Sequence, residues 1–236
     1  MADILPFGKK PDLPKYPPKD YRIEAKGDHA EVVLYGVVGD PFDGISAKQV
    51  FEDLRKVESA KTLSIHINSP GGFVTEGVAI ANRIRAHKAR KTVHVDGEAS
   101  SIASYIAMVG DEIVMGEGSL MLVHRPWTFV IGNEDDMERA LRDLRTVQKD
   151  IVAAYAARTK MKPDAVLSLM AEDRYMDAAE AVDLGFADRA VSGTRMAALA
   201  VDRGALRLPD LPKQTAALKA RMAAAAAKIR AATSPR

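Results

Sequence analysis

The sequence predicts an α/β fold with a mainly parallel sheet. Two observations lead to this class. Short runs rich in β-branched residues alternate with segments whose apolar residues recur at helical spacing, and the loops between them are short. Strands that alternate with helices usually pair in parallel, because each helix carries the chain back across the sheet.

The predicted elements follow one another without long interruptions. Ser46 is placed to cap an amphipathic helix over 47–57, in which Val50, Leu54 and Val57 share one face. Gly185 comes just after the last predicted helix, in the position that commonly ends one. In chain order the strands are predicted at 31–39, 62–67, 92–95, 112–115 and 120–123, and the other helices at 77–88, 98–110, 134–158, 163–170 and 178–184.

Two glycine-containing segments are predicted to end the strands before them. Asp96-Gly97 is a turn signal after the strand at 92–95. The segment NSPGG, residues 68–72, follows the strand at 62–67. Its two glycines leave backbone N–H groups free to point into a cleft, although a tight turn alone would also explain them.

Both ends of the chain differ in composition from the middle. Residues 1–20 hold five prolines and predict a flexible arm, 193–212 predict a linker, and 213–236 predict a basic, alanine-rich tail that is helical or disordered. The folded domain is predicted at 21–192. Residues 1–19 carry a charge of +2 and the tail +6, so the whole-chain charge of +2 leaves 20–212 with −6. We therefore expect no nucleic-acid surface on the folded body, although the tail could contact RNA, DNA or an acidic partner.

Composition excludes several classes of site. The chain has no cysteine, which rules out disulfides, thiolate zinc sites and a cysteine nucleophile. No apolar run approaches the roughly 20 residues that span a bilayer, and the first residues lack the apolar stretch of a secretory signal. Phosphate-loop, dinucleotide and metal-ligand motifs are also absent from the sequence. We expect a soluble, cytoplasmic protein with no metal, no cofactor and no membrane contact.

Three positions offer the residue types of a nucleophile, a base and an orienting acid. Ser101 begins the small-residue helix after a strand, where helix N–H groups favour a developing oxyanion. A structural helix cap would explain it equally, as it would Ser100 and Ser104. His124 ends the strand at 120–123, the edge where α/β sites usually lie.

The orienting acid has three candidates, and the other four histidines have structural explanations. The candidate acids are Glu172, Asp173 and Asp177; Asp177 is explained as the N-cap of the last helix, whereas Asp173 has no such structural role. We expect His66 and His94 within strands, and His29 and His87 in turns or exposed helical positions.

Four motifs, taken together, carry a specific resemblance. INSPGG at 67–72, GEASSIAS at 97–104, LVHRPW at 122–127 and EDRYMDAAEAVDLGFAD at 172–188 resemble the Clp protease proteolytic subunit, ClpP, in order and spacing. The chain is still more similar to the ClpP-related head-maturation proteases of tailed phages and prophages. The segments VLYGVVGD, GISAKQVFEDL and DIVAAYAARTKM also look like those phage proteins. The resemblance covers about residues 31–190.

The resemblance implies a site and a fold. It implies Ser101 as nucleophile, His124 as general base and Asp173 as the acid that orients the imidazole, with Glu172 as the fallback acid. Gly72 and Ile102 would supply the N–H groups of the oxyanion hole. The implied fold is a ClpP/crotonase-like spiral of ββα units, with the helix at 134–158 protruding as a handle. The chain departs from the family by having Ile102 where methionine is usual and Arg125 where glutamine or asparagine is usual.

The resemblance also implies partners. The substrates would be proteins or peptides, and the chain would self-associate into rings, as a heptamer or stacked double heptamer. Capsid or scaffold protein would be a further partner, and the location would be the bacterial or phage-infected cytoplasm or a procapsid. The Pro-rich arm does not resemble the segment that contacts an unfoldase in ClpP, so a Clp-type ATPase stays an open question.

Four alternatives compete with a head-maturation protease. A general ATP-dependent Clp-type degrading subunit would use the same site. An acyl-CoA hydratase or isomerase would share the fold but would not need a serine, a histidine and an acid at these spacings. A non-catalytic assembly protein would not need all three positions filled. A membrane-anchored signal-peptide peptidase would need an anchor.

Overall fold

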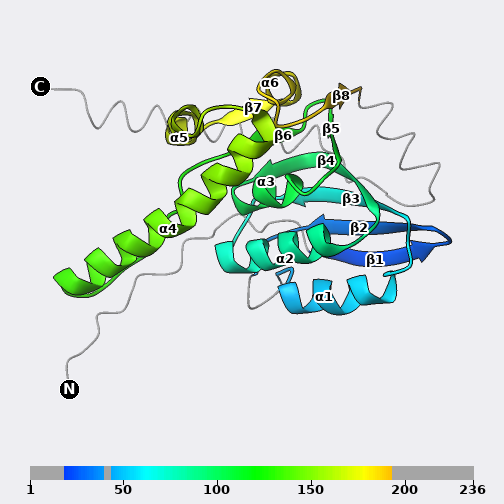
Figure 1. Ribbon diagram of the computed structural model, residues 1–236, viewed down its shortest axis with the longest axis horizontal. Helices are drawn as coiled ribbons and strands as arrows, with labels where there is room; N and C mark the ends of the chain where they lie inside the picture. Colours follow the sequence, from blue (N-terminus) through cyan, green and yellow to red (C-terminus); the bar gives the residue numbers. More distant parts are fainter. Residues whose placement is uncertain (1–18, 40–43, 193–236) are drawn as a thin grey trace, which may run out of the picture. The chain divides into compact units, whose positions relative to one another are not determined.

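An eight-stranded sheet organises the part of the chain that the computed structural model describes, residues 19–39 and 44–192 (Figure 1). The strand order is β1-β2-β3-β4-β5-β8, and β6 pairs with β4 and β7. Only β1–β2 and β6–β7 are antiparallel, so the predicted α/β class with a mainly parallel sheet is confirmed. The strands are β1 Asp20–Lys26, β2 His29–Tyr35, β3 Thr62–Ser69, β4 Arg90–Ser100, β5 Glu112–Gly116, β6 Leu120–Leu122, β7 Tyr175–Asp177 and β8 Arg189–Val191.

The helices lie at their predicted positions with small changes at the ends, except that the helix predicted at 98–110 is shorter, because β4 extends to Ser100 and α3 begins only at Ile102. Ser46 caps the first helix through its side chain, which accepts a hydrogen bond from the N–H of Gln49. Gly185 follows the last helix with φ +80°, as expected for a residue that ends a helix. The helices are α1 Ala47–Lys56, α2 Val74–Ala86, α3 Ile102–Ala107, α4 Glu134–Thr159, α5 Pro163–Glu172 and α6 Ala178–Asp183. Residues 1–18 of the arm predicted at 1–20, the linker and the tail lie outside the described residues, and the last residue of the predicted arm, Asp20, begins β1.

Part of the core lies between the sheet and the helices α1 and α2, which run side by side over it (Figure 1), and the core continues to α3, α4 and α5. Alternate residues of each strand point to the same face, so Val32, Ile65 and Val93 form one apolar layer and are fully buried. Leu54 and Ile80 come from the facing helices and are fully buried with them. Within the described ranges, no helix is long and apolar enough to cross a membrane.

Strand β1 was not predicted from the sequence. It pairs with β2 as a hairpin, and Gly27 at φ +63° makes the turn between them. Tyr21 and Ile23 pack against the core, while Asp20, Arg22 and Glu24, which alternate with them, are charged. This alternation over a short edge strand is a weak signal, because most of the strand is only half-buried.

The turn predicted at Asp96-Gly97 is wrong, because β4 continues through it to Ser100. The dipeptide instead marks a shift in the pairing of β4 with β3, between the pairs Ile67–Val95 and Ser69–Ala99. A Cβ on Gly97 would lie 2.5 Å from the Asn68 side-chain oxygen, so glycine is what permits this close approach. The irregularity lets β4 pair with β5 at its start and with β6 at its end.

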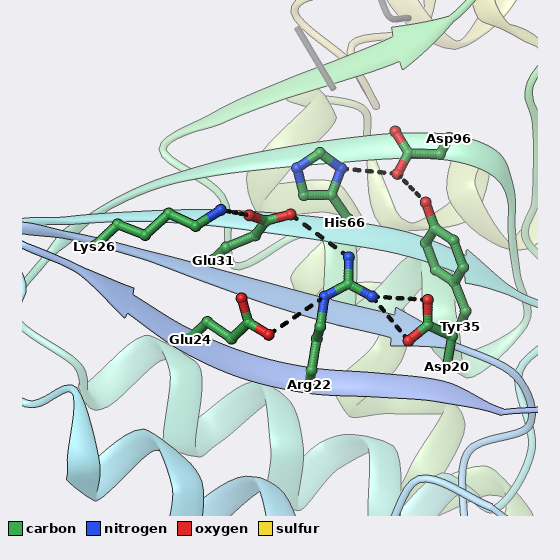
Figure 2. A network of polar contacts seen from close by, with 8 residues as sticks. All are labelled: Asp20, Arg22, Glu24, Lys26, Glu31, Tyr35, His66 and Asp96. Atoms are coloured by element: carbon green, nitrogen blue, oxygen red, sulfur yellow. Dashed lines mark hydrogen bonds and ion pairs between the residues drawn. The ribbon is translucent and has the colours of Figure 1, made fainter. Parts of the chain in front are cut away.

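The opposite face of β1–β4 carries a network of polar side chains (Figure 2). Glu31 accepts a hydrogen bond from Lys26 at 2.8 Å and lies 3.9 Å from Arg22. Asp96 accepts from Tyr35 at 2.6 Å and lies 2.8 Å from His66 Nδ1. The sheet therefore has one apolar face and one face joined by ion pairs and hydrogen bonds.

Glu31 should make stability depend on pH. Its side chain is 3% exposed, and burial alone would raise its pKa. The hydrogen bond and charge of Lys26, with the charge of Arg22, outweigh burial and hold the pKa below its ordinary value. A lowered folded-state pKa stabilises the protein above the unfolded pKa, and this stability is lost as pH falls through the folded one. In urea denaturation, Glu31→Gln should lose about 1 kcal/mol near pH 7 and progressively less toward about pH 3.

Glu24→Gln is the matched control, because Glu24 of β1 is paired with Glu31 of β2 and lies on the same face of the sheet. Its side chain is 53% exposed and lies 4.0 Å from Arg22, so we expect a change within about 0.5 kcal/mol. A deficit for Glu31→Gln that stays constant across this pH range would contradict the prediction.

Candidate active site

The pairing of three strands brings the candidate residues together. Ser100 at the end of β4 is paired in parallel with Leu122 at the end of β6, so Ser101 and His124 leave neighbouring strand ends. Leu122 is also paired antiparallel with Tyr175 of β7. His124 lies two residues after Leu122, and Asp173 lies two residues before Tyr175, so the same register brings His124 and Asp173 opposite each other. Residues far apart in sequence thus meet at one sheet edge.

Ser101 has an unusual backbone at the junction of β4 and α3. Its φ of 56° and ψ of −128° are sparsely populated for a residue with a side chain. Its N–H donates to the Leu122 carbonyl at 2.9 Å, which holds it beside β6. Its Oγ lies 2.7 Å from Nε2 of His124, a normal hydrogen-bond distance. With the hydroxyl donating, the imidazole is placed to accept the serine proton.

Asp173 is the acid that lies next to His124. Its Oδ1 is 3.5 Å from His124 Nδ1, an ion-pair distance longer than a good hydrogen bond. Asp173 has a left-handed backbone, with φ 48°, and its side chain is 69% exposed, against 18% for His124. The other two acids have their own roles. Glu172 bonds to Arg174 at 2.6 Å, and the Asp177 carboxylate caps α6 by accepting from Glu180 N–H, as predicted for Asp177.

The NSPGG loop lies against Ser101. Val38 N–H donates to the Gly71 carbonyl and Phe73 N–H to the Val38 carbonyl, both at 2.8 Å, so the N–H of Gly72 points away from Val38. A Cβ on Gly71 would lie 2.6 Å from the Cβ of Ser101. The N–H of Ile102 is the first of α3, and a first helical N–H has no acceptor within its own helix. These two backbone donors are the chain's candidates for an oxyanion hole.

Ser100 differs from Ser101 in where its hydroxyl points. Its Oγ donates to Glu98 Oε2 at 2.8 Å rather than to a histidine. Burial, followed by the charge of Glu98, raises the pKa of the Tyr175 phenol beside them. The phenol of Tyr175 therefore keeps its proton at neutral pH. Within the described ranges, no three His, Asp or Glu side chains are grouped to hold a metal ion.

The four other histidines lie elsewhere. His66 and His94 are in β3 and β4, as predicted, and their rings stack with centroids 4.7 Å apart. The expectation of a turn or exposed helix is wrong for His29, because it begins β2, where its Nδ1 lies 2.9 Å from the Thr62 hydroxyl oxygen. The expectation of an exposed position for His87 is wrong, because it is buried at the end of α2, with Nδ1 accepting from Ala89 N–H. Packing of the α2–β4 loop explains this burial.

Sequence reasoning missed two contributors to the geometry. Strand β7 has only three residues, too short for a periodic signal, yet its register sets the position of Asp173. Tyr155 of α4 contacts Ser104 three residues after the nucleophile candidate. The available signal was a single tyrosine in an otherwise charged and alanine-rich helix, AAYAART.

Comparisons with known proteins agree on one family. A model of the Clp protease family matches residues 30–194, which include Ser101, His124 and Asp173. An ATP-dependent Clp protease proteolytic subunit from Pleurastrum terricola is 29% identical over 133 residues, covering 56% of this chain and 68% of that protein. The ATP-dependent Clp protease proteolytic subunit 2 of Chlamydia trachomatis serovar D is 26% identical over 147 residues, covering 60% of this chain and 71% of its own length.

Gly71→Ala should destabilise the site by steric conflict as well as by backbone strain. Gly71 has φ +95°, and a methyl group there would meet Ser101 Cβ at 2.6 Å and the Ser100 carbonyl oxygen at 2.7 Å. Gly118→Ala isolates the strain, because Gly118 has φ +80° and a methyl group there would have no atom within 4 Å. In urea denaturation Gly118→Ala should cost about 1 kcal/mol and Gly71→Ala about 2 kcal/mol more. Equal losses would show that Ser101 does not restrict the loop.

Proposed function

This chain belongs to the Clp protease family, and we propose that it is a serine endopeptidase whose catalytic residues are Ser101, His124 and Asp173. The observation that carries the proposal is the 2.7 Å contact between Ser101 Oγ and His124 Nε2. A nucleophile and a base within hydrogen-bond reach, with the base beside a third group, are the arrangement that serine hydrolases use. We assign residues 21–192 to the protease domain.

Acylation of Ser101 is the first half of the proposed reaction. His124 Nε2 accepts the hydroxyl proton while Oγ bonds to the carbonyl carbon of the scissile peptide, and the carbonyl electron pair moves to oxygen. When the tetrahedral intermediate collapses, the C–N bond breaks and His124 gives its proton to the leaving amine. The amino-terminal fragment of the substrate remains as an ester on Ser101.

Water completes the cycle. His124 removes a proton from a water molecule as the water oxygen bonds to the ester carbonyl carbon. The Ser101 oxygen then leaves and takes the proton back from His124, which releases the carboxylic acid product. Asp173 stabilises the imidazolium in both halves. The N–H groups of Gly72 and Ile102 would each stabilise the oxyanion by about 3 kcal/mol.

The relation of Ser101 to His124 argues against the other functions with this fold. A hydratase or isomerase that relies on backbone oxyanion donors alone has no use for a serine hydroxyl 2.7 Å from an imidazole. A purely structural serine cap would bond to its own helix, but Ser101 makes no side-chain cap bond to α3. Both points support an activated nucleophile.

Self-association into rings is the second part of the proposal. Five large apolar side chains before and within the first half of α4 are between 47% and 79% exposed. The relatives' names describe proteolytic subunits of ATP-dependent Clp proteases, which supports assembly with other subunits. These exposed apolar residues are Trp127, Phe129, Ile131, Met137 and Leu141. We propose that they contact a second copy within a heptamer or stacked double heptamer.

We further propose head maturation as the biological role, with a capsid or scaffold protein as substrate. The support is the resemblance of VLYGVVGD, GISAKQVFEDL and DIVAAYAARTKM to phage head-maturation proteases. Such an enzyme would act in the infected cytoplasm or inside a procapsid. The alternative is a general degrading subunit that depends on a Clp-type ATPase, which the relatives' names support.

Ser101→Ala should abolish acylation and peptide cleavage without changing assembly. Removal of Oγ removes the atom that attacks, whereas the backbone bonds of residue 101 remain. The measurement is labelling with a fluorophosphonate, followed by peptide mapping, together with hydrolysis of a short fluorogenic peptide. Ser100→Ala is the matched control, because its hydroxyl bonds to Glu98; it should label at Ser101 like the wild type.

Labelling retained in Ser101→Ala, or lost in Ser100→Ala, would move the nucleophile elsewhere. The same pair of variants tests the substrate class. Processing of a purified scaffold or capsid precursor without ATP supports head maturation, and cleavage that needs an unfoldase and ATP supports the degrading subunit. Labelling of Ser101 in each oligomer separated by size shows which assembly is active.

Asp173→Asn should lower kcat by at least about 100-fold, because the amide can neither fix the imidazole tautomer nor stabilise its positive charge. Glu172→Gln and Asp177→Asn are controls that alter neighbouring acids. Since Glu172 bonds to Arg174 and Asp177 caps α6, each should change kcat by less than about threefold. Steady-state hydrolysis of the fluorogenic peptide measures all three. A larger loss for Glu172→Gln than for Asp173→Asn would reassign the orienting acid.

A further inference from the structure

A chain of buried hydroxyl groups connects helix α4 to the backbone of Ser101. Ser104 Oγ donates to the Ser101 carbonyl at 2.6 Å and lies 2.8 Å from the phenol oxygen of Tyr155. Both side chains are almost fully buried, with Ser104 at 0% and Tyr155 at 2% exposure. Tyr155 comes from α4 and follows Ser104 by 51 residues in the sequence.

The direction of the hydrogen bonds follows from the protons available. A serine hydroxyl has one proton, and Ser104 uses it on the Ser101 carbonyl, which can only accept. Tyr155 must therefore donate to Ser104 Oγ. Burial raises the pKa of the Tyr155 phenol, so the proton that this bond needs stays in place at neutral pH.

The bonds act on the strained part of the nucleophile. The N–H of Ser101 is held by the Leu122 carbonyl of β6, which restrains φ, and its carbonyl is held by the N–H and Oγ of Ser104, which restrains ψ. A residue in a sparsely populated conformation keeps it only when its surroundings hold it on both sides. Tyr155 orients the Ser104 hydroxyl and thereby supports the second restraint.

We propose that Tyr155, acting through Ser104, is a positioning residue that keeps Ser101 in its attacking conformation. The inference rests on the proposed serine protease function, because it concerns how the nucleophile is held. The Tyr155 hydroxyl bonds to Ser104, whereas the reacting hydroxyl of Ser101 bonds to His124, so the effect of Tyr155 passes through Ser104. Its ring has a separate packing role against Phe186, with centroids 5.5 Å apart, and phenylalanine would keep that role.

The test is a double-mutant cycle on the rate of Ser101 acylation. Tyr155→Phe should slow fluorophosphonate labelling about threefold and Ser104→Ala about tenfold. The double variant should react no more slowly than Ser104→Ala, because Tyr155 has no other route to Ser101. With a fluorogenic peptide, the losses should appear in kcat while KM is unchanged.

Stability separates positioning from packing. Ser104→Ala leaves the Tyr155 hydroxyl buried without its partner, and adding Tyr155→Phe removes that group as well. The double variant should therefore melt at a higher temperature than Ser104→Ala although its acylation rate is the same. Tyr21→Phe is the matched control: it removes a phenol that donates to Asp53 at 2.9 Å on β1, and it should label at the wild-type rate.

Each outcome has a definite meaning. Three results would overturn the positioning role alone. Tyr155→Phe could label at the wild-type rate, the loss in the double variant could equal the product of the two single losses, or the change could be confined to KM. Because Tyr155→Phe keeps the ring in place, it decides the question even if Ser104→Ala does not fold. A wild-type protein that gives no Ser101 adduct in any oligomer would overturn the proposed protease function and the positioning role with it.

Discussion

The backbone of Ser101 is the constraint on which the candidate site depends. Its φ of 56° and ψ of −128° turn the chain abruptly from β4 into α3 and project the hydroxyl toward His124. Such a conformation costs about 1–3 kcal/mol, which the surrounding structure must offset. The abrupt turn also requires glycine at two neighbouring positions. There is no room for a methyl group at Gly71, beside Ser101, or at Gly77, beside the Ile102 side chain.

Strand pairing, rather than sequence proximity, then completes the site. The end of β4 lies between β3 and β6 because the irregularity at Asp96-Gly97 lets one strand pair with different neighbours along its length. The antiparallel contact of β6 with β7 adds the acid. A one-residue slip in either register would turn alternate side chains to the other face. The geometry around His124 is therefore a property of the whole sheet.

The sequence predicted the class of fold and the residue types of the site better than their arrangement. Helix α1 and its cap have strong periodic and capping signals, and β3 and the first half of β4 are runs rich in β-branched residues. Strands β1 and β7 have weak ones, because β1 is a half-buried edge strand and β7 is only three residues long. The Asp-Gly turn signal failed because glycine serves a close backbone contact there as well as it serves a turn. Tyr155 was missed because a buried hydroxyl partner leaves no spacing pattern.

Helix α4 combines two environments, and this division bears on how assembly and chemistry are connected. Ion pairs such as Asp136–Arg139 and Glu138–Arg142 would suit a solvated face. Solvation does not explain why Met137 and Leu141 on the same half, and three large apolar residues just before it, are also exposed. The other half buries Ile151, Val152 and Tyr155 against the domain. Because one continuous helix carries both halves, the surface proposed to meet a second copy and the phenol that supports Ser101 belong to the same rigid element.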